Sequence, residues 1–250
     1  MDSKTHDKDG NPLNLMPKAN RLHQASYYDT WLTTPERYEP TPEDIKCELQ
    51  LQALGNFEQL CFNFNYEKFT KELENFEFVP YLRREGITND RDGLMLVGLE
   101  GDKSNDSLSR PEAIARAGRH LEETDFTFPT DAYIGLTSLH EVLDYWGGLG
   151  RTMIVKSNKG GWFPPHRDAP QLTRDCFRVI VFLGPATDFD AYEWYLGDER
   201  RIIIPNTAYY VDTRKVHRTH AWADDSYHLV LNVPKTWPNV LKLMSKLRHY

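Results

Sequence analysis

Short hydrophobic runs, each closed by turn-forming residues, dominate the chain after Gly150. The runs are rich in β-branched and aromatic residues, and sequences such as Lys159-Gly160-Gly161 and Pro205-Asn206 separate them. Short strands at this spacing predict an antiparallel sandwich or barrel of jelly-roll type rather than βαβ units. The predicted strands are Arg151–Lys156, Cys176–Leu183, Tyr192–Leu196, Arg201–Ile204, Ala208–Asp212, Val216–Trp222 and Tyr227–Val233.

Before Gly150 the signals are mainly those of helices. Thr41 followed by Pro42 is typical of a helix cap and first turn, and Ile45, Leu49 and Leu54 give this helix a predicted apolar stripe. Three further helices are predicted from similar start and stop signals: from Ser109 to about Glu122, from Ser138 to Gly147-Gly148, and from Pro238 to Arg248.

These elements indicate one α+β, mainly β, domain. Residues 1–25 lack periodicity and are expected to be a flexible leader, and residues 26–250 form the domain. Within it we expect a helical and loop part at 26–148, a β core at 149–235 and a terminal helix at 236–250. The stretches 83–93 and 100–108 are rich in Asp, Asn, Ser and Gly and are predicted loops.

Composition narrows the class of protein. The 250 residues are 40% hydrophobic and 27% charged, as in ordinary globular proteins, and the net charge of −7 argues against a nucleic-acid partner. No apolar run approaches the roughly 20 residues that span a bilayer, so no membrane association is expected. The polar first residues are not expected to form a secretory signal or a transit peptide. Three widely spaced cysteines indicate reduced thiols and a cytoplasmic location.

His166 and Asp168 form the first candidate for chemistry. On an extended segment residues i and i+2 point to the same side, so an imidazole and a carboxylate converge. A third ligand from a later strand would complete the facial triad of two histidines and one carboxylate that binds iron(II) and leaves positions open. His217 and His220 compete for that place, and because they face opposite sides of a strand only one can point inward. The alternative for each histidine is an imidazole on the surface or in the core that is hydrogen-bonded to a backbone group and binds no metal.

Arg178 is the second candidate. It is the charged residue within the apolar run Cys176–Leu183, and a buried guanidinium requires an anion. The carboxylate of a bound ligand or a structural Asp or Glu would satisfy it.

The segment from Arg151 to Leu183, with Pro164-Pro165-His166-Arg167-Asp168 followed by the Arg178 strand, resembles the iron(II)/2-oxoglutarate-dependent oxygenases. Within them it is most similar to the aspartyl/asparaginyl β-hydroxylase and proline cis-hydroxylase group, over about residues 137–233. The resemblance implies a double-stranded β-helix (cupin-like jelly roll), with His166, Asp168 and His217 as iron ligands.

The same resemblance implies Fe(2+), 2-oxoglutarate and O2 as cofactor and cosubstrates, with Arg178 on the 2-oxoglutarate carboxylate. The family usually has a further basic anchor shortly after the distal His, but here the chain reads Asp224-Asp225-Ser226-Tyr227-His228. Ser226 and His228 are the nearest substitutes at that position. Arg178, Arg151 or Arg218 would then have to supply the positive charge.

The resulting hypothesis is an oxygenase that hydroxylates an amino-acid-like small molecule or a protein or peptide side chain, releasing succinate and CO2. Related halogenases lack the carboxylate ligand, so Asp168 favours hydroxylation. Two alternatives remain open. One is a cupin-type metalloenzyme that uses the same ligands without 2-oxoglutarate, and the other is a non-enzymatic β-sandwich binding module in which the histidines bind no metal.

Overall fold

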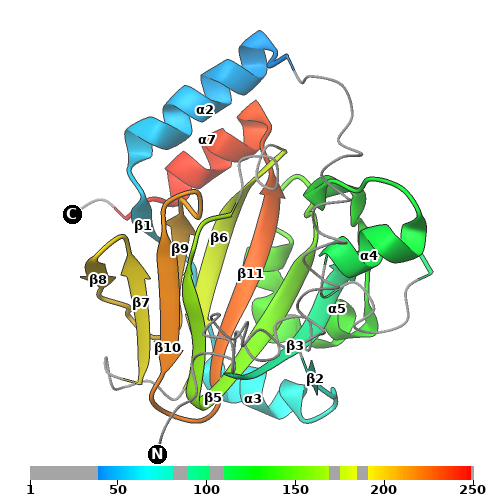
Figure 1. The fold of residues 1–250 in the computed structure, drawn as a ribbon, viewed down its shortest axis with the longest axis vertical. Coiled ribbons are helices and arrows are strands. Elements are labelled where there is room, and N and C mark those ends of the chain that lie inside the picture. Colours follow the sequence, from blue (N-terminus) through cyan, green and yellow to red (C-terminus); the bar gives the residue numbers. More distant parts are fainter. Residues whose placement is uncertain are drawn as a thin grey trace, which may run out of the picture.

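The strands form one curled antiparallel sheet in the order β1-β9-β6-β11-β5-β10-β7-β8, with β3 also paired to β5 (Figure 1). This computed structural model describes residues 39–80, 89–101, 108, 110–168, 175–184 and 191–248. The strands are β1 Phe57–Leu60, β2 Val79–Pro80, β3 Asn89–Gly98, β4 Phe128–Pro129, β5 Thr152–His166, β6 Cys176–Leu183, β7 Tyr192–Leu196, β8 Glu199–Arg201, β9 Thr207–Val211, β10 His217–Ala221 and β11 Ser226–Pro234.

Strand β5 belongs to two layers. Its first half, up to Ser157, pairs with β11 and β3, whereas its second half, from Trp162 to His166, pairs with β10 and contacts β3 only at Trp162, the partner of Asn89. We call β1-β9-β6-β11, the first half of β5 and β3 the major layer, and the second half of β5 with β10, β7 and β8 the minor layer. From β5 onward the chain crosses repeatedly between the layers, as in a jelly roll. The topology therefore confirms the predicted double-stranded β-helix.

Side chains from both layers meet inside the β-helix. On β6, Ile180 and Phe182 belong to this inner cluster, while the alternate residues Val179 and Val181 belong to the core on the other face. Strand β6 is therefore buried on both faces, which explains its continuous apolar sequence. The inner cluster is Ile180, Phe182, Tyr192, Trp194, Ile203, Tyr209, Val211 and Ala221.

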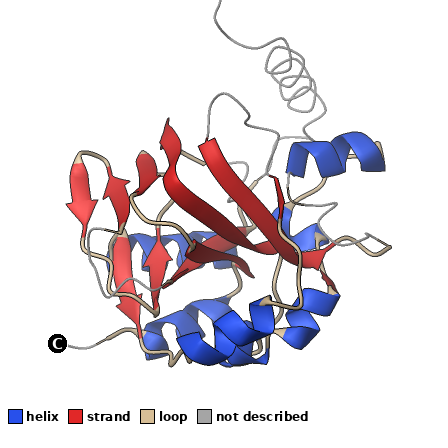
Figure 2. Cartoon of the chain, turned by 90° about the horizontal axis from the view of Figure 1, so that it is seen from below, coloured by secondary structure: helices blue, strands red, loops and turns tan. Residues whose placement is uncertain are grey.

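Most of the helices gather on one side of the strands (Figure 2), whereas the helix Arg110–Ala117 packs in a separate small cluster. The larger core cluster joins buried residues of several helices, including Leu51, Phe69, Leu143 and Leu243, to the outer face of the major layer. The opposite face of that layer is thus left for the interior of the β-helix. The helices are α2 Pro42–Leu54, α3 Tyr66–Leu73, α4 Arg110–Ala117, α5 Asp131–Gly135, α6 His140–Leu143 and α7 Trp237–Lys246, with 3-10 turns at Glu123–Asp125 and Thr137–Leu139.

Three predictions about strands need correction. The strand predicted at Arg201–Ile204 lies earlier in the structure, at Glu199–Arg201, where its residues pair with β7. The strand predicted at Arg151–Lys156 runs on to His166, through the sequence that was expected to form a turn at Lys159-Gly160-Gly161. Gly160 adopts a φ of 87°, so the backbone changes direction there without ending the strand. The stretch 83–93 was expected to be a loop, but Asn89–Gly98 is strand β3, because pairing with β5 supplies hydrogen-bond partners.

The predicted start of the first helix is confirmed, but its predicted packing face is wrong. Thr41 and Asp44 form a capping box, with Pro42 in the first turn. Ile45 and Leu49 are 47% and 61% exposed, and Cys47 and Leu51 are the buried residues. The helix therefore packs on the core with the face that carries Cys47 and Leu51, and the face with Ile45 and Leu49 points toward solvent.

Two other helices are shorter than predicted. Helix α4 ends at Ala117, before the expected Glu122, because Gly118 adopts a left-handed φ of 64°. The helix predicted from Ser138 is divided into a 3-10 turn and the four-residue α6. The terminal helix is close to its prediction and is capped by Thr236.

The expected flexible leader at 1–25 lies outside the described residues. All three cysteines are free thiols, as predicted. Among the described helices, none has the length and apolarity needed to cross a membrane.

Candidate metal centre

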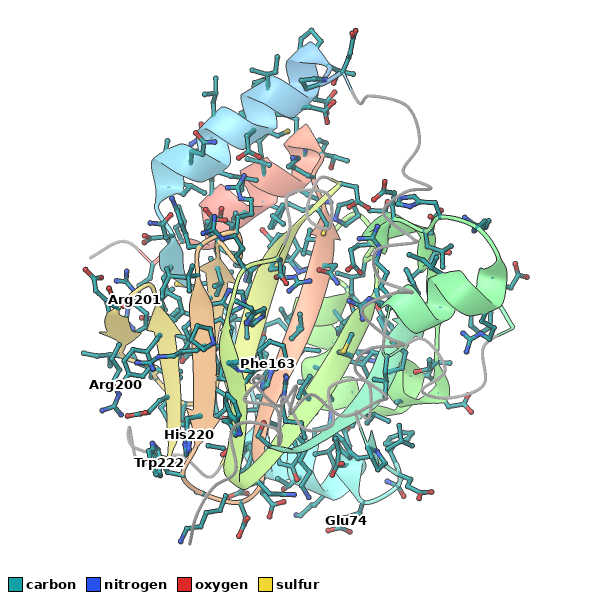
Figure 3. The ribbon with its side chains drawn as sticks, viewed as in Figure 1. Glu74, Phe163, Arg200, Arg201, His220 and Trp222 are labelled. Atoms are coloured by element: carbon teal, nitrogen blue, oxygen red, sulfur yellow. The ribbon has the colours of Figure 1, made fainter. Side chains whose placement is uncertain are left out.

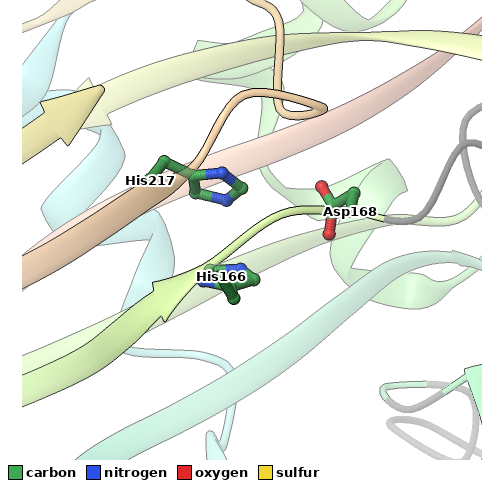
Figure 4. Close-up of side chains that lie close together, drawn as sticks. All are labelled: His166, Asp168 and His217. Carbon is green, nitrogen blue, oxygen red and sulfur yellow. The ribbon is translucent and has the colours of Figure 1, made fainter. Parts of the chain in front are cut away.

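Three potential metal ligands converge where β5 ends and β10 begins (Figure 4). His166 is the last residue of β5, His217 is the first of β10, and the two are direct cross-strand partners. Asp168 follows two residues after His166. One ligand atom from each of the three side chains lies within 4.8 Å of those of the other two. The structure thus brings together the three residues that the sequence suggested as iron ligands.

The hydrogen bonds of the two histidines fix their tautomers. Nδ1 of His166 lies 2.9 Å from the carbonyl oxygen of Pro164, and Nδ1 of His217 lies 2.9 Å from that of Lys215. Because a carbonyl oxygen only accepts, each Nδ1 must carry the proton and donate it. Each Nε2 then presents a lone pair, which is the state that a metal requires of a neutral imidazole.

Asp168 is ionised and held in place by several groups. It is buried, and its carboxylate forms an ion pair with the Arg178 guanidinium. Burial raises the pKa of the Asp168 carboxyl, but the neighbouring Arg178 and the two histidines reverse this effect and hold that pKa below its ordinary value. Its backbone N–H also donates to the carbonyl of Thr213 at 2.9 Å. A carboxylate has two oxygens, so it can bind Arg178 and a metal together.

Aromatic rings enclose the two histidines. The indole of Trp194 stacks on His217, with ring centroids 5.3 Å apart and planes 9° from parallel. The Phe163 ring contacts His166 edge-on, at 4.1 Å between centroids. These contacts restrict the rotation of both imidazoles and keep water from one side of each.

His220 does not join the cluster. Its ring lies against Trp222, with centroids 3.9 Å apart, and both residues lie at the β7–β10 side of the molecule, away from Phe163 (Figure 3). Since alternate residues of β10 face opposite sides, the inward position belongs to His217, which is buried, as are Thr219 and Ala221.

Arg178 finds its anion within the protein. Besides Asp168, it donates from Nε to Oδ1 of Asn232 at 3.0 Å, and its Nη2 lies 4.0 Å from Glu123. Glu123 in turn binds Arg151 through two contacts, of 2.8 Å and 3.1 Å. The carboxylates of Asp168 and Glu123 raise the pKa of Arg178, outweighing its burial. The metal ligands are therefore continuous with a buried network of charges.

The residues suggested as 2-oxoglutarate anchors lie on the inward face of β11 and are buried. His228 is 3% exposed, and its Nδ1 lies 3.3 Å from the hydroxyl of Tyr192. Burial, together with the positive charge of Arg91, lowers the pKa of His228 well below its ordinary value, so this imidazole is neutral. Ser226 is two residues earlier on the same face of β11, and its hydroxyl donates to the carbonyl of Ala223.

Sequence reasoning missed several residues around this centre. Glu123 and Asn232 complete the network around Arg178, Phe163 lies against His166, and Arg91 lies over the Phe163 ring. Asn232 shares the inward register of Ser226 and His228, so alternation along β11 was a signal that could have found it. Glu123 and Arg91 come from the first half of the chain and carry no local signal of their position.

No protein-family model and no curated protein matches the chain. Solved structures similar to it include a 2OG-Fe(II) oxygenase family protein from Burkholderia pseudomallei, with 15% identity, a TM-score of 0.42 and coverage of 81% of this chain and 96% of that one. A prolyl hydroxylase from Trichoplax adhaerens, solved with a peptide of hypoxia inducible factor, has 15% identity, a TM-score of 0.39 and coverage of 81% and 93%. KdgF from Halomonas sp. has 21% identity and a TM-score of 0.27, over 34% of this chain and 67% of that one.

The donor set itself fits a first-row divalent metal. Two neutral imidazole nitrogens and one carboxylate oxygen on adjacent strand ends form the facial arrangement typical of non-haem iron(II) sites. Zinc also binds this ligand combination. The geometry can therefore hold a divalent ion with open positions for further ligands.

Proposed function

We propose that this protein is an iron(II)- and 2-oxoglutarate-dependent oxygenase that hydroxylates an amino-acid-like small molecule or a protein side chain, with succinate and CO2 as co-products. The observation that carries the proposal is the His166–Asp168–His217 cluster, in which both Nδ1 atoms donate to backbone carbonyls, so that each Nε2 carries the lone pair that a metal binds. The double-stranded β-helix supports it, because its strand ends bring these residues together.

Each part of the site has a definite task in this proposal. His166, Asp168 and His217 hold the metal, which when bound supplies the oxygen and redox chemistry. Trp194 and Phe163 orient the histidines and exclude water. We assign Arg178 a positioning role on Asp168, because that carboxylate is its partner here. Direct contact of Arg178 with 2-oxoglutarate stays a prediction, as do contacts from Ser226 and His228.

Two considerations narrow the reaction. Asp168 occupies the place that a halide would need, which favours hydroxylation over halogenation. The net charge of −7 favours an amino-acid-like substrate over a nucleobase, since phosphate binding draws on a clustered basic surface. The cupin-type alternative uses the same three ligands but has no requirement for 2-oxoglutarate.

The test is succinate formation by the iron-loaded protein with free amino acids, peptides and single-stranded DNA, followed by mass spectrometry of each substrate. We expect substrate-dependent succinate and the addition of one oxygen atom to an amino acid or a peptide. His217→Ala serves as the inactive control and His220→Ala as the matched active one. Oxygen added to DNA alone would contradict the substrate class, and turnover without 2-oxoglutarate would favour the cupin-type enzyme.

A further inference from the structure

The last strand carries no arginine or lysine on its inward face near its start, where Ser226 and His228 lie. The register of the neighbouring strands brings an arginine to this place. Ser226 on β11 pairs with Ser157 on β5, and Ser157 pairs in turn with Arg91 on β3. Direct cross-strand partners share a face of the sheet, so two serines and one arginine form a row across three strands.

The aromatic contacts connect this row to the metal ligands. The Arg91 guanidinium lies over the Phe163 ring, with Cζ 4.6 Å from its centroid, and the same ring contacts the His166 imidazole. Phe163 lies near the middle of the β-helix in Figure 3. A single aromatic ring therefore separates a cation on β3 from a ligand of the candidate metal centre.

Electrostatic effects show that Arg91 acts on the interior of the β-helix. Burial is the larger cause of the lowered pKa of His228, and the positive charge of Arg91 is the second cause. Burial raises the pKa of Tyr192, and the charge of Arg91 opposes that effect. His228 and Tyr192 are both buried and contact each other, so the guanidinium faces a neutral, polar surface made of an imidazole, a phenol and two serine hydroxyls.

The arginines considered from the sequence have other positions. Arg151 is bound to Glu123 and to the carbonyl of Leu108. Arg178 is bound to Asp168 and Asn232. Arg218 alternates with the inward residues of β10, is exposed, and stacks on Tyr195 at 4.0 Å. Among these four arginines, Arg91 is the one that lies beside the surface formed by Ser226 and His228.

We propose that Arg91 binds the distal carboxylate of 2-oxoglutarate, replacing the basic residue that the C-terminal strand lacks. The inference rests on the proposed function: His166, Asp168 and His217 would hold the metal that binds the keto-acid end of the cosubstrate, and Arg91, beyond the Phe163 ring, would hold its other end. A guanidinium has five N–H donors in a planar fork, so it can bind a carboxylate bidentately while it keeps other contacts. Ser226, Ser157 and Tyr192 add neutral hydrogen-bonding groups beside the same carboxylate.

Comparing the binding of two ligands measures what the distal carboxylate contributes to affinity. 2-Oxopentanoate has the same five-carbon keto-acid chain as 2-oxoglutarate but ends in a methyl group. Calorimetric titration of the Mn²⁺-loaded protein without oxygen measures the affinity for each, with no dependence on turnover. We expect wild type to prefer 2-oxoglutarate by about tenfold or more, as for a charge-assisted bidentate contact.

Arg91→Ala should bind the two ligands equally, with unchanged Mn²⁺ affinity and 2-oxopentanoate affinity. Arg91→Lys, which keeps the charge and loses the fork, should retain part of the preference, and Arg218→Ala should retain all of it. A preference that persists in Arg91→Ala, or that is lost in Arg178→Ala instead, would overturn the assignment while leaving the proposed function intact. Failure of wild type to bind 2-oxoglutarate at all would overturn both.

Discussion

The guanidinium of Arg178, on β6, forms an ion pair with the carboxylate of Asp168, beyond the end of β5. The anion that a buried arginine requires is thus one of the three candidate metal ligands. The pair has two consequences: it keeps Asp168 ionised in the absence of a metal, and it fixes where that carboxylate points. Metal-site geometry and protein stability are therefore coupled through Arg178.

Arg178→Met should destabilise the metal-free protein by about 3–5 kcal/mol, because it leaves a buried carboxylate without its partner. Urea unfolding of the wild type and the variant measures the change. Asp168→Asn combined with Arg178→Met forms the double-mutant cycle. We expect the double variant to be more stable than the sum of the single losses indicates. Additive losses would mean that the ion pair contributes nothing beyond packing.

Replacing any one of His166, Asp168 or His217 by alanine should lower iron(II) or Mn²⁺ affinity by far more than the 10–100-fold typical of residues that only support a ligand. Anaerobic calorimetry with each variant checks this. His220→Ala is the matched control, since it removes a histidine from the same strand but from outside the cluster. Loss of binding in His220→Ala with binding retained in His217→Ala would reverse the assignment of the distal ligand.

Trp194→Ala should weaken metal binding by about 10–100-fold, as expected for a residue that orients a ligand, because the indole stacks on His217. Trp194→Phe keeps an aromatic face and should lose less. The decisive comparison is the metal affinity of Trp194→Ala against that of Trp194→Phe. Circular dichroism checks that the two variants are folded to the same extent. Equal affinities would show that the stack does not orient the imidazole.

His228 should make the folded state less stable in mild acid. Its native pKa is depressed well below the ordinary value of 6.5, so below that pH the unfolded chain binds a proton that the native protein does not. The contribution of the neutral His228 to the stability of the folded state is fully present above pH 6.5 and is lost as the pH falls toward the native pKa. Between pH 6.5 and about 5 the wild type should lose up to about 1.4 kcal/mol per pH unit more than His228→Gln. Parallel stability curves for the two proteins would contradict this.

Much of the β core could be predicted because alternation and turn chemistry are local. The strands at Cys176–Leu183 and Tyr192–Leu196 were predicted with their observed bounds, and the turn at Pro205-Asn206 was confirmed with Asn206 at a left-handed φ of 55°. Local signals failed where pairing decided the outcome. Asn89–Gly98 forms a strand through its pairing with β5, β2 and β4, and the exposure of Ile45 and Leu49 follows from how α2 meets the core.

In the candidate site, too, some relationships could be predicted from the sequence and others could not. The sequence by itself determined that His166 and Asp168 share a side of an extended segment and that His217 and His220 cannot both point inward, because both statements depend only on the two-residue period of a strand. The tertiary structure decided which histidine faces His166, that the anion of Arg178 is Asp168, and that Arg91 reaches the interior. These relationships depend on cross-strand register and on contacts between residues far apart in the chain, and no local pattern encodes either one.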